Sequence, residues 1–141
     1  MRVYNSIHLV KSEDLNHHGT LFAARTAAWY VEAAFAAAAA TNRNSDEIVC
    51  RNIHGMSFGV PVNMGDLICF SSRVARVGRT SITVHVSVRS ELTGAEQVSG
   101  FVTFVTVDKE GRKKPHGIVL DEPADEEERR IRELANKLFE K

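Results

Sequence analysis

The chain has 141 residues, of which 43% are hydrophobic and 26% are charged, as in a soluble globular protein. This length suffices for one domain with a sizeable core and is too short for two ordinary domains. Because 18 basic residues balance 18 acidic residues, the net charge gives no reason to expect binding to nucleic acid or to an anionic membrane.

The first third of the chain predicts a strand, a polar loop and a long helix. Residues 3–10 have the mixed pattern of a strand, and the polar residues 11–20 form a loop. A helix is expected from about Phe22 to Ala40, with Thr20 as its N-cap. Alanine dominates this helix, so we expect it to be buried on every side, with its first backbone N–H groups in a dry place. Such groups hold an anion or polarise a carbonyl, which is the geometry of a binding site.

From residue 48 the hydrophobic period changes to two, as in a sheet with one covered face. Strands are expected at residues 48–58, 67–77, 81–90 and 97–107, separated by turns. One buried helix and long antiparallel strands predict an α+β domain over residues 1–120, in which the sheet curls around the helix. Residues 121–141 predict a helical tail that packs on the body or on a neighbouring subunit. Its apolar stripe consists of Ile131, Leu134, Ala135 and Leu138.

The sequence predicts a cytoplasmic protein. The N-terminal residues lack the apolar segment of a signal peptide, and no apolar run approaches the length of a membrane span. Cys50 and Cys69 stand in separate strand-like segments without metal or redox spacing. We therefore expect free thiols in a reducing compartment.

Two spaced motifs frame the predicted site. The first consists of Asp14, Asn16, Gly19 and Thr20, followed by Phe22-Ala23-Ala24. The second consists of Met56, Phe58, Pro61, Val62, Gly65 and Asp66, and a turn at Val77–Ser81 follows it. Together they resemble the hotdog-fold acyl-CoA thioesterases, in the group of bacterial broad-specificity acyl-CoA thioesterases and cytosolic acyl-CoA hydrolases.

The resemblance covers about residues 3–120 and implies a hotdog fold that acts on an acyl-CoA thioester. It implies no cofactor apart from the coenzyme A of the substrate. It also implies a homodimer with two sites at the interface, assembled further into trimers of dimers. The chain departs from the family pattern at Thr20, where many relatives have Asp, and at Ala23 and Ala24, where Gly-Gly is usual.

Thioester hydrolysis needs a clamp on the carbonyl oxygen and a carboxylate that acts as base or nucleophile. We expect the clamp from backbone N–H groups at the helix start, with the donors among Phe22, Ala23 and Ala24. Asn16 and Thr20 are expected to orient the attacking water or the thioester by hydrogen bonds.

Three acids compete for the role of the carboxylate: Asp14, Glu32 and Asp66. Asp66 closes the Pro-Val turn and is expected to cap it. Glu32 is our choice, because it is the only acid of the helix and a lone buried carboxylate usually has a task or a partner. An ion pair across a subunit interface and an exposed strip of the helix are its alternative interpretations.

His17, His18 and Gly19 are expected to line the substrate. Adjacent histidines do not easily chelate one ion, so no metal site is expected. The phosphates of coenzyme A require a basic rim. Its candidates are Arg73, Arg76 and Arg79, which lie on or after one predicted strand, and the run Arg112, Lys113 and Lys114. We place the nucleotide phosphates at this run, with an ordinary solvated turn as the alternative. His54 and His85 are expected to be sheet histidines with satisfied rings.

The leading interpretation is an acyl-CoA thioester hydrolase. The alternative is a non-catalytic module that binds acyl-CoA or an acyl carrier, because Thr20 replaces the family Asp. A hydratase or dehydratase of the same fold is the third interpretation. It requires an Asn and a His after a Gly-Asp pair, and residues 65–68 lack both.

Overall fold

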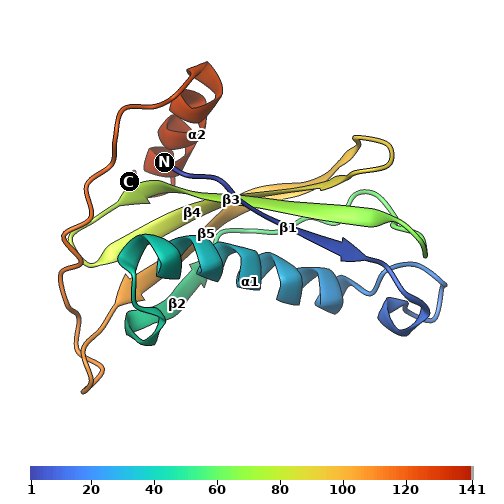
Figure 1. The fold of residues 1–141 in the computed structure, drawn as a ribbon, viewed down its shortest axis with the longest axis horizontal. Coiled ribbons are helices and arrows are strands. Elements are labelled where there is room, and N and C mark those ends of the chain that lie inside the picture. The colour runs from blue at the N-terminus through green and yellow to red at the C-terminus, as the bar shows by residue number, and fades with distance from the viewer. Residues whose placement is uncertain (141) are drawn as a thin grey trace.

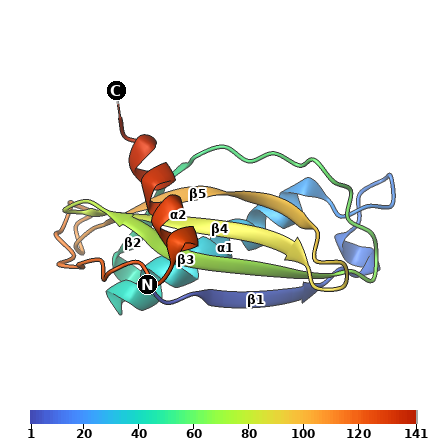
Figure 2. The same ribbon diagram turned by 90° about the horizontal axis from the view of Figure 1, so that it is seen from above.

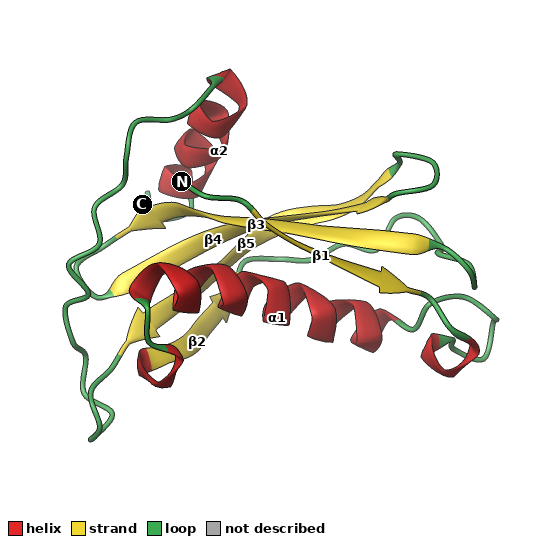
Figure 3. Cartoon of the chain, viewed as in Figure 1, coloured by secondary structure: helices red, strands yellow, loops and turns green. Residues whose placement is uncertain are grey.

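The computed structural model describes residues 1–140, which form a five-stranded antiparallel sheet with one long helix on each face (Figure 1). The strands are β1 (Tyr4–Leu9), β2 (Ile48–Ile53), β3 (Leu67–Val77), β4 (Ser81–Ser90) and β5 (Glu96–Thr106). Their order across the sheet is β1-β3-β4-β5-β2. Helix α1 (Ala23–Asn42) runs along one face, and α2 (Glu126–Lys137) lies against the other, so that the sheet separates the two helices (Figure 3). The predicted α+β arrangement is confirmed.

Small side chains allow α1 to lie close to the sheet. The side of the helix that faces the sheet carries Ala33, Ala34, Ala37 and Ala38, all buried. Ser72 of β3, also buried, donates a hydrogen bond from its hydroxyl to the Ala33 carbonyl at 2.8 Å. Alanine thus serves here to shorten the distance between helix and sheet.

The other side of α1 is exposed. Ala28, Glu32, Ala36 and Ala40 follow one another at intervals of four residues, which places them in one stripe along the helix. The expectation of a helix buried on every side is therefore wrong for the single chain. The same stripe leaves room for a second copy of the chain to approach closely.

The central strands match the sequence prediction and the edge strands are shorter. β3 and β4 have the expected bounds, whereas β1 and β2 have 6 residues each. The register of β2 with β5 shifts between Cys50 and Asn52, and the regular pairing ends at Ile53, two residues before Gly55, which has a φ of +80°. Residues 54–66 then pass along the edge of the sheet beside β5, to the end where α1 begins (Figure 2).

Helix α2 packs with one half of its predicted stripe. Ile131 and Ala135 are buried against Ala75 and Phe101 of the sheet, whereas Leu134 and Leu138 stay exposed. The division of the chain at residue 120 stays a prediction. No helix within residues 1–140 combines the length and the apolar character that crossing a membrane requires.

Glu128 ties α2 to the start of the chain. Its carboxylate is 1% exposed and accepts hydrogen bonds from the Ala124 N–H, the N-terminal ammonium of Met1 and Arg132, at 2.8, 2.8 and 3.0 Å. Burial alone raises the pKa of Glu128, but these donors together bring it down to about 2. Glu128 is therefore ionised in the folded protein at neutral pH.

Candidate functional site

Asn16 organises the polar loop that precedes α1. Its side-chain oxygen accepts hydrogen bonds from the backbone N–H groups of His18 and Thr20, at 2.9 and 3.2 Å. Its side-chain nitrogen donates to the Thr20 hydroxyl at 3.1 Å. Gly19 closes the turn with a φ of +80°, a conformation that favours glycine. Asn16 and Thr20 are thus brought together, and in the single chain their side chains hold the loop in shape.

Phe22, and not Thr20, is the N-cap of α1. The Thr20 hydroxyl is already paired with Asn16 and makes no capping hydrogen bond. Phe22 has the extended backbone angles φ −67° and ψ 127°, so the chain enters the helix without a side-chain cap. The prediction of Thr20 as the cap is wrong because the loop itself uses this side chain.

Two backbone donors remain free at the helix start. The Phe22 N–H donates to the Asp14 carbonyl at 2.9 Å, whereas the N–H groups of Ala23 and Ala24 donate to no acceptor within residues 1–140. Both alanines are exposed, so the expectation of a dry enclosure is wrong for the single chain. The two N–H groups point out of the positive end of a 20-residue helix and can hold an anionic or carbonyl oxygen.

The two sequence motifs meet in space. The Leu21 N–H donates to the Val62 carbonyl at 2.8 Å, and Thr20 forms a β-bridge with Asn63. The segment 61–66 therefore packs against the loop directly before the helix start. This contact explains why both motifs belong to one site.

Two of the three candidate acids are engaged in structural contacts. Asp66 accepts hydrogen bonds from the Leu67 N–H at 2.8 Å and from the Ser90 hydroxyl at 2.7 Å, which confirms its role as a turn cap. Asp14 is buried, accepts from the Lys11 N–H at 2.9 Å and pairs with Arg25 at 3.4 Å.

Glu32 lies on the exposed stripe of α1, so the premise that it is buried is wrong for the single chain. It follows Ala23 by nine residues, which places its backbone about 13 Å further along the helix axis. A general base acts within hydrogen-bond distance or through one water. Glu32 is therefore too far along the helix to serve the helix start of its own chain.

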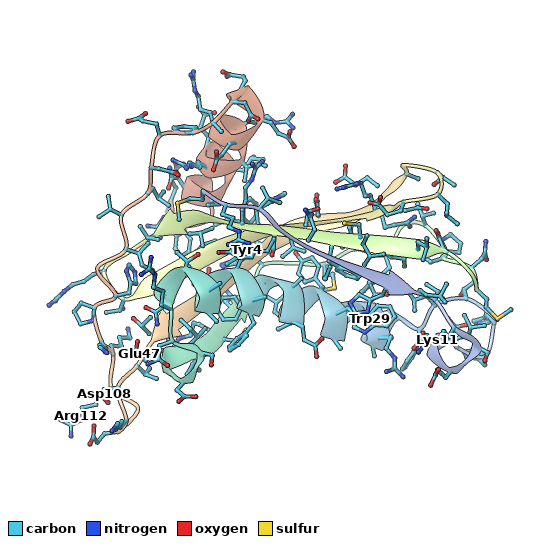
Figure 4. All side chains as sticks on the ribbon, in the orientation of Figure 1. Tyr4, Lys11, Trp29, Glu47, Asp108 and Arg112 are labelled. Carbon is cyan, nitrogen blue, oxygen red and sulfur yellow. The ribbon has the colours of Figure 1, made fainter. Side chains whose placement is uncertain are left out.

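The predicted basic rim lies at the opposite end of the molecule. Arg112 lies near Glu47 and Asp108, where α1 ends, whereas Lys11 and Trp29 lie toward the end where α1 begins (Figure 4). Lys114 forms an ion pair with Glu47, and the Arg79 carbonyl accepts from the His116 N–H in the adjoining segment. Since the 20 residues of α1 span about 30 Å, the single chain does not bring Arg79 or residues 112–114 to the helix start.

Other cations, which the sequence analysis did not select, lie beside the helix start. Lys11 and Arg25 line a groove of about 400 Å³ between β1 and α1. Its aromatic wall is the pair His8 and Trp29, whose rings stack with centroids 4.2 Å apart. Burial lowers the pKa of His8, although the nearby charges of Glu32 and Asp14 act in the opposite direction. Arg25 stands two residues after the helix start, and this spacing was the feature of the sequence that could have identified it as a cation of the site.

The remaining histidines divide between loop and sheet. His17 and His18 are exposed beside the helix start, with ring centroids 3.9 Å apart. His54 contacts the Thr103 hydroxyl at 2.7 Å, as expected for a satisfied sheet histidine. His85 packs on Phe101 with a centroid distance of 5.1 Å. Within residues 1–140 no group of three His, Cys, Asp or Glu side chains is arranged to hold a metal ion.

Comparison with known proteins gives the class to which this fold and site belong. The sequence pattern of the thioesterase superfamily matches residues 18–95. An uncharacterized acyl-CoA thioester hydrolase of Bacillus subtilis is 32% identical over 117 residues, which cover 80% of this chain and 67% of that protein. The matched segments cover only 41–56% of other curated acyl-CoA thioester hydrolases.

Solved structures give the same answer for the fold. A hexameric acyl-CoA thioesterase superposes with a TM-score of 0.85 at 32% identity, over 96% of this chain and 86% of that chain. An acyl-CoA hydrolase of Bacillus cereus superposes with a TM-score of 0.84 at 28% identity, over 96% and 83%. The chain belongs to the thioesterase superfamily, and the predictions of a hotdog fold and of a thioester hydrolase are confirmed.

Proposed function

We propose that the protein hydrolyses acyl-CoA thioesters to a free acid and coenzyme A. The observation that carries this proposal is the pair of free N–H groups at Ala23 and Ala24, at the positive end of a long helix. Charge develops on the thioester oxygen as water attacks, and preorganised donors stabilise it more in the transition state than in the ground state. The names of the relatives, all acyl-CoA thioester hydrolases, support this substrate class.

The site is proposed to need a second copy of the chain. Within residues 1–140 β2 pairs with β5 alone, so its other edge is open, and Val49 and Ile53 of this strand are 46% and 42% exposed. An open edge strand beside an exposed helix stripe favours pairing with another copy of the same surface. We infer a homodimer joined along β2 and α1. The hexameric state of the similar thioesterase supports further assembly into a trimer of dimers.

Such a dimer supplies the missing carboxylate. Ala28 lies midway between Ala24 and Glu32 on the exposed stripe, four residues from each. If two antiparallel helices cross at a two-fold axis near Ala28, the residue four positions after the axis meets the residue four positions before it. Glu32 of the partner subunit then lies opposite Ala24, at the free N–H groups.

In the proposed step the carboxylate of Glu32 of the partner subunit takes a proton from water, and the water oxygen attacks the thioester carbon. The N–H groups of Ala23 and Ala24 hold the negative oxygen that forms. The C–S bond then breaks, and the sulfur leaves with the transferred proton as the thiol of coenzyme A. Asn16 and Thr20 orient the water, and the step needs no cofactor.

The remaining predicted residues are assigned to the coenzyme. His17, His18 and Gly19 form the exposed turn that the pantetheine arm passes. Because Arg79 and residues 112–114 lie at the far end of their own α1, they contribute to phosphate binding only from a neighbouring copy. We also propose a cytoplasmic location, which the free thiols of Cys50 and Cys69 support.

Thiol release from a panel of acyl-CoAs tests the proposal. We expect turnover by the wild type and a loss of at least a hundredfold in kcat for Glu32→Gln, as for removal of a general base. Glu13→Gln is the control, because it removes the same charge from an exposed acid that the proposed step does not use. Binding of acyl-CoA without any thiol release contradicts hydrolysis and favours the binding module. Full turnover by Glu32→Gln contradicts the assignment of the base.

A further inference from the structure

A second groove lies on the face of the sheet opposite α1, and the proposed reaction does not use it. Its volume is about 540 Å³, and it lies between α2 and the strands β3, β4 and β5. The floor is a row of small polar side chains that are register neighbours on four strands: Asn5, Ser71, Ser87 and Ser99. This volume is in the range of about 300–1,000 Å³ that is typical of small-molecule sites.

Three arginines from three elements surround this floor: Arg73 of β3, Arg89 of β4 and Arg130 of α2. Arg89 donates to the Ser71 hydroxyl at 3.1 Å and pairs with Glu91 at 3.5 Å. Within residues 1–140 neither Arg73 nor Arg130 forms an ion pair, although Glu96 and Glu127 also line the groove. Two guanidinium groups with unused donors therefore face the same hollow.

His85 lies beside Arg73 in the sheet register and lines the same groove. Burial, together with the positive charge of Arg73, lowers the pKa of His85 to about 4, so its ring is neutral at pH 7. The groove thus combines positive charge with hydroxyl and imidazole donors. Guanidinium forks beside hydroxyl donors match the geometry of a phosphate group.

We propose that this groove binds a phosphate-bearing anion, held by Arg73 and Arg130 and hydrogen-bonded by the serine hydroxyls of the floor. The phosphates come from one of two sources: coenzyme A, or a free polyphosphate. The inference does not depend on the hydrolytic mechanism, because no residue of the groove belongs to the proposed catalytic site.

Isothermal titration calorimetry with inorganic pyrophosphate tests the proposal on the full-length protein. We expect Arg130→Gln and Arg73→Gln each to weaken pyrophosphate binding about tenfold or more, as for loss of a charge-assisted hydrogen bond. Arg129→Gln is the matched control. It removes the same charge from the adjacent position of α2, where Arg129 pairs with Glu126 and does not line the groove. The control is expected to bind as the wild type does.

A second titration, in the presence of saturating coenzyme A, separates the two sources. If coenzyme A displaces pyrophosphate and also binds less tightly to Arg73→Gln, the groove takes the phosphates of the coenzyme. If pyrophosphate binds unchanged beside coenzyme A, the groove takes a free polyphosphate. Both results support the proposal.

Two results overturn it. In the first, the wild type does not bind pyrophosphate; if the groove variants then also lower the oligomeric state in sedimentation, the groove is an interface between copies. In the second, Arg129→Gln weakens pyrophosphate binding as much as Arg130→Gln does, which shows that binding depends on the general positive charge of the surface and not on the groove. Each of these experiments measures pyrophosphate binding or assembly and none measures thiol release. Failure of this proposal is therefore distinguishable from failure of the hydrolase proposal.

Discussion

Replacing Ala23 by proline removes one proposed oxyanion donor and leaves the helix in place. Ala23 is the first residue of α1, where proline is favoured because its missing N–H has no partner in the helix. Proline also requires an extended residue before it, and Phe22 already has φ −67° and ψ 127°. We therefore expect a stability change within about 0.5 kcal/mol. Loss of one oxyanion donor costs about 10²–10³ in kcat, or roughly 3–4 kcal/mol of transition-state stabilisation.

The assay follows thiol release under saturating acyl-CoA, with thermal unfolding measured on the same samples. Ala23→Ser is the matched control, because it changes the side chain and keeps the N–H. It is expected to retain kcat within about threefold, a loss of less than 1 kcal/mol. A folded Ala23→Pro enzyme with wild-type kcat would refute the assignment of this N–H group to the carbonyl clamp.

Four further predictions concern the core, the contacts of Glu128 and the loop. Tyr30→Phe is expected to stabilise the protein by about 1 kcal/mol in urea unfolding, because the buried hydroxyl has no partner within residues 1–140. Gly100→Ala places a methyl group 2.7 Å from that hydroxyl and is expected to cost about 1–3 kcal/mol. Most of this cost should disappear in the double variant, and strictly additive effects would contradict the contact. Since the pKa of Glu128 is about 2 when folded and 4.5 otherwise, its contribution is present above pH 4.5 and is lost as the pH falls toward 2. Urea unfolding should show a loss of roughly 3 kcal/mol over this range, which Glu128→Gln abolishes, and an unchanged slope in the variant would count against the ion cluster. Asn16→Ala is expected to speed hydrogen exchange of the His18 and Thr20 amides at least tenfold, because it removes their common acceptor. Unchanged exchange would show that other contacts hold the loop.

The central sheet could be predicted from the sequence because its residues alternate cleanly. β3 and β4 have neighbours on both sides, so their period of two reports the covered face directly. β2 was predicted too long, since the residues after Ile53 remain partly apolar while the positive φ of Gly55 ends the regular pairing with β5. Such a register shift depends on the neighbouring strand and leaves no mark in the local pattern.

The site was predictable where its contacts are local in the chain. The loop from Asn16 to Thr20 and the turn cap at Asp66 follow from residue types that bond to nearby backbone. The position of Glu32 was not predictable, because alanine has the same character on the exposed and the buried side of a helix. The distance between Arg112 and the helix start depends on the length of α1 and the direction of β5. Pairing of β5 with β4 and β2 sets its direction, and the local sequence pattern does not report this pairing.

Activity of mixed oligomers tests most directly whether the site is shared between two chains. Ala23→Pro and Glu32→Gln chains, each inactive alone, are co-expressed and assayed together for thiol release. If Glu32 acts across the interface, a mixed dimer has one intact site, and random association in a two-fold dimer restores about one quarter of wild-type activity. Mixing Glu32→Gln with the chain that carries both substitutions is the control, in which no complete site can form. A mixture as inactive as either variant alone would contradict the shared site.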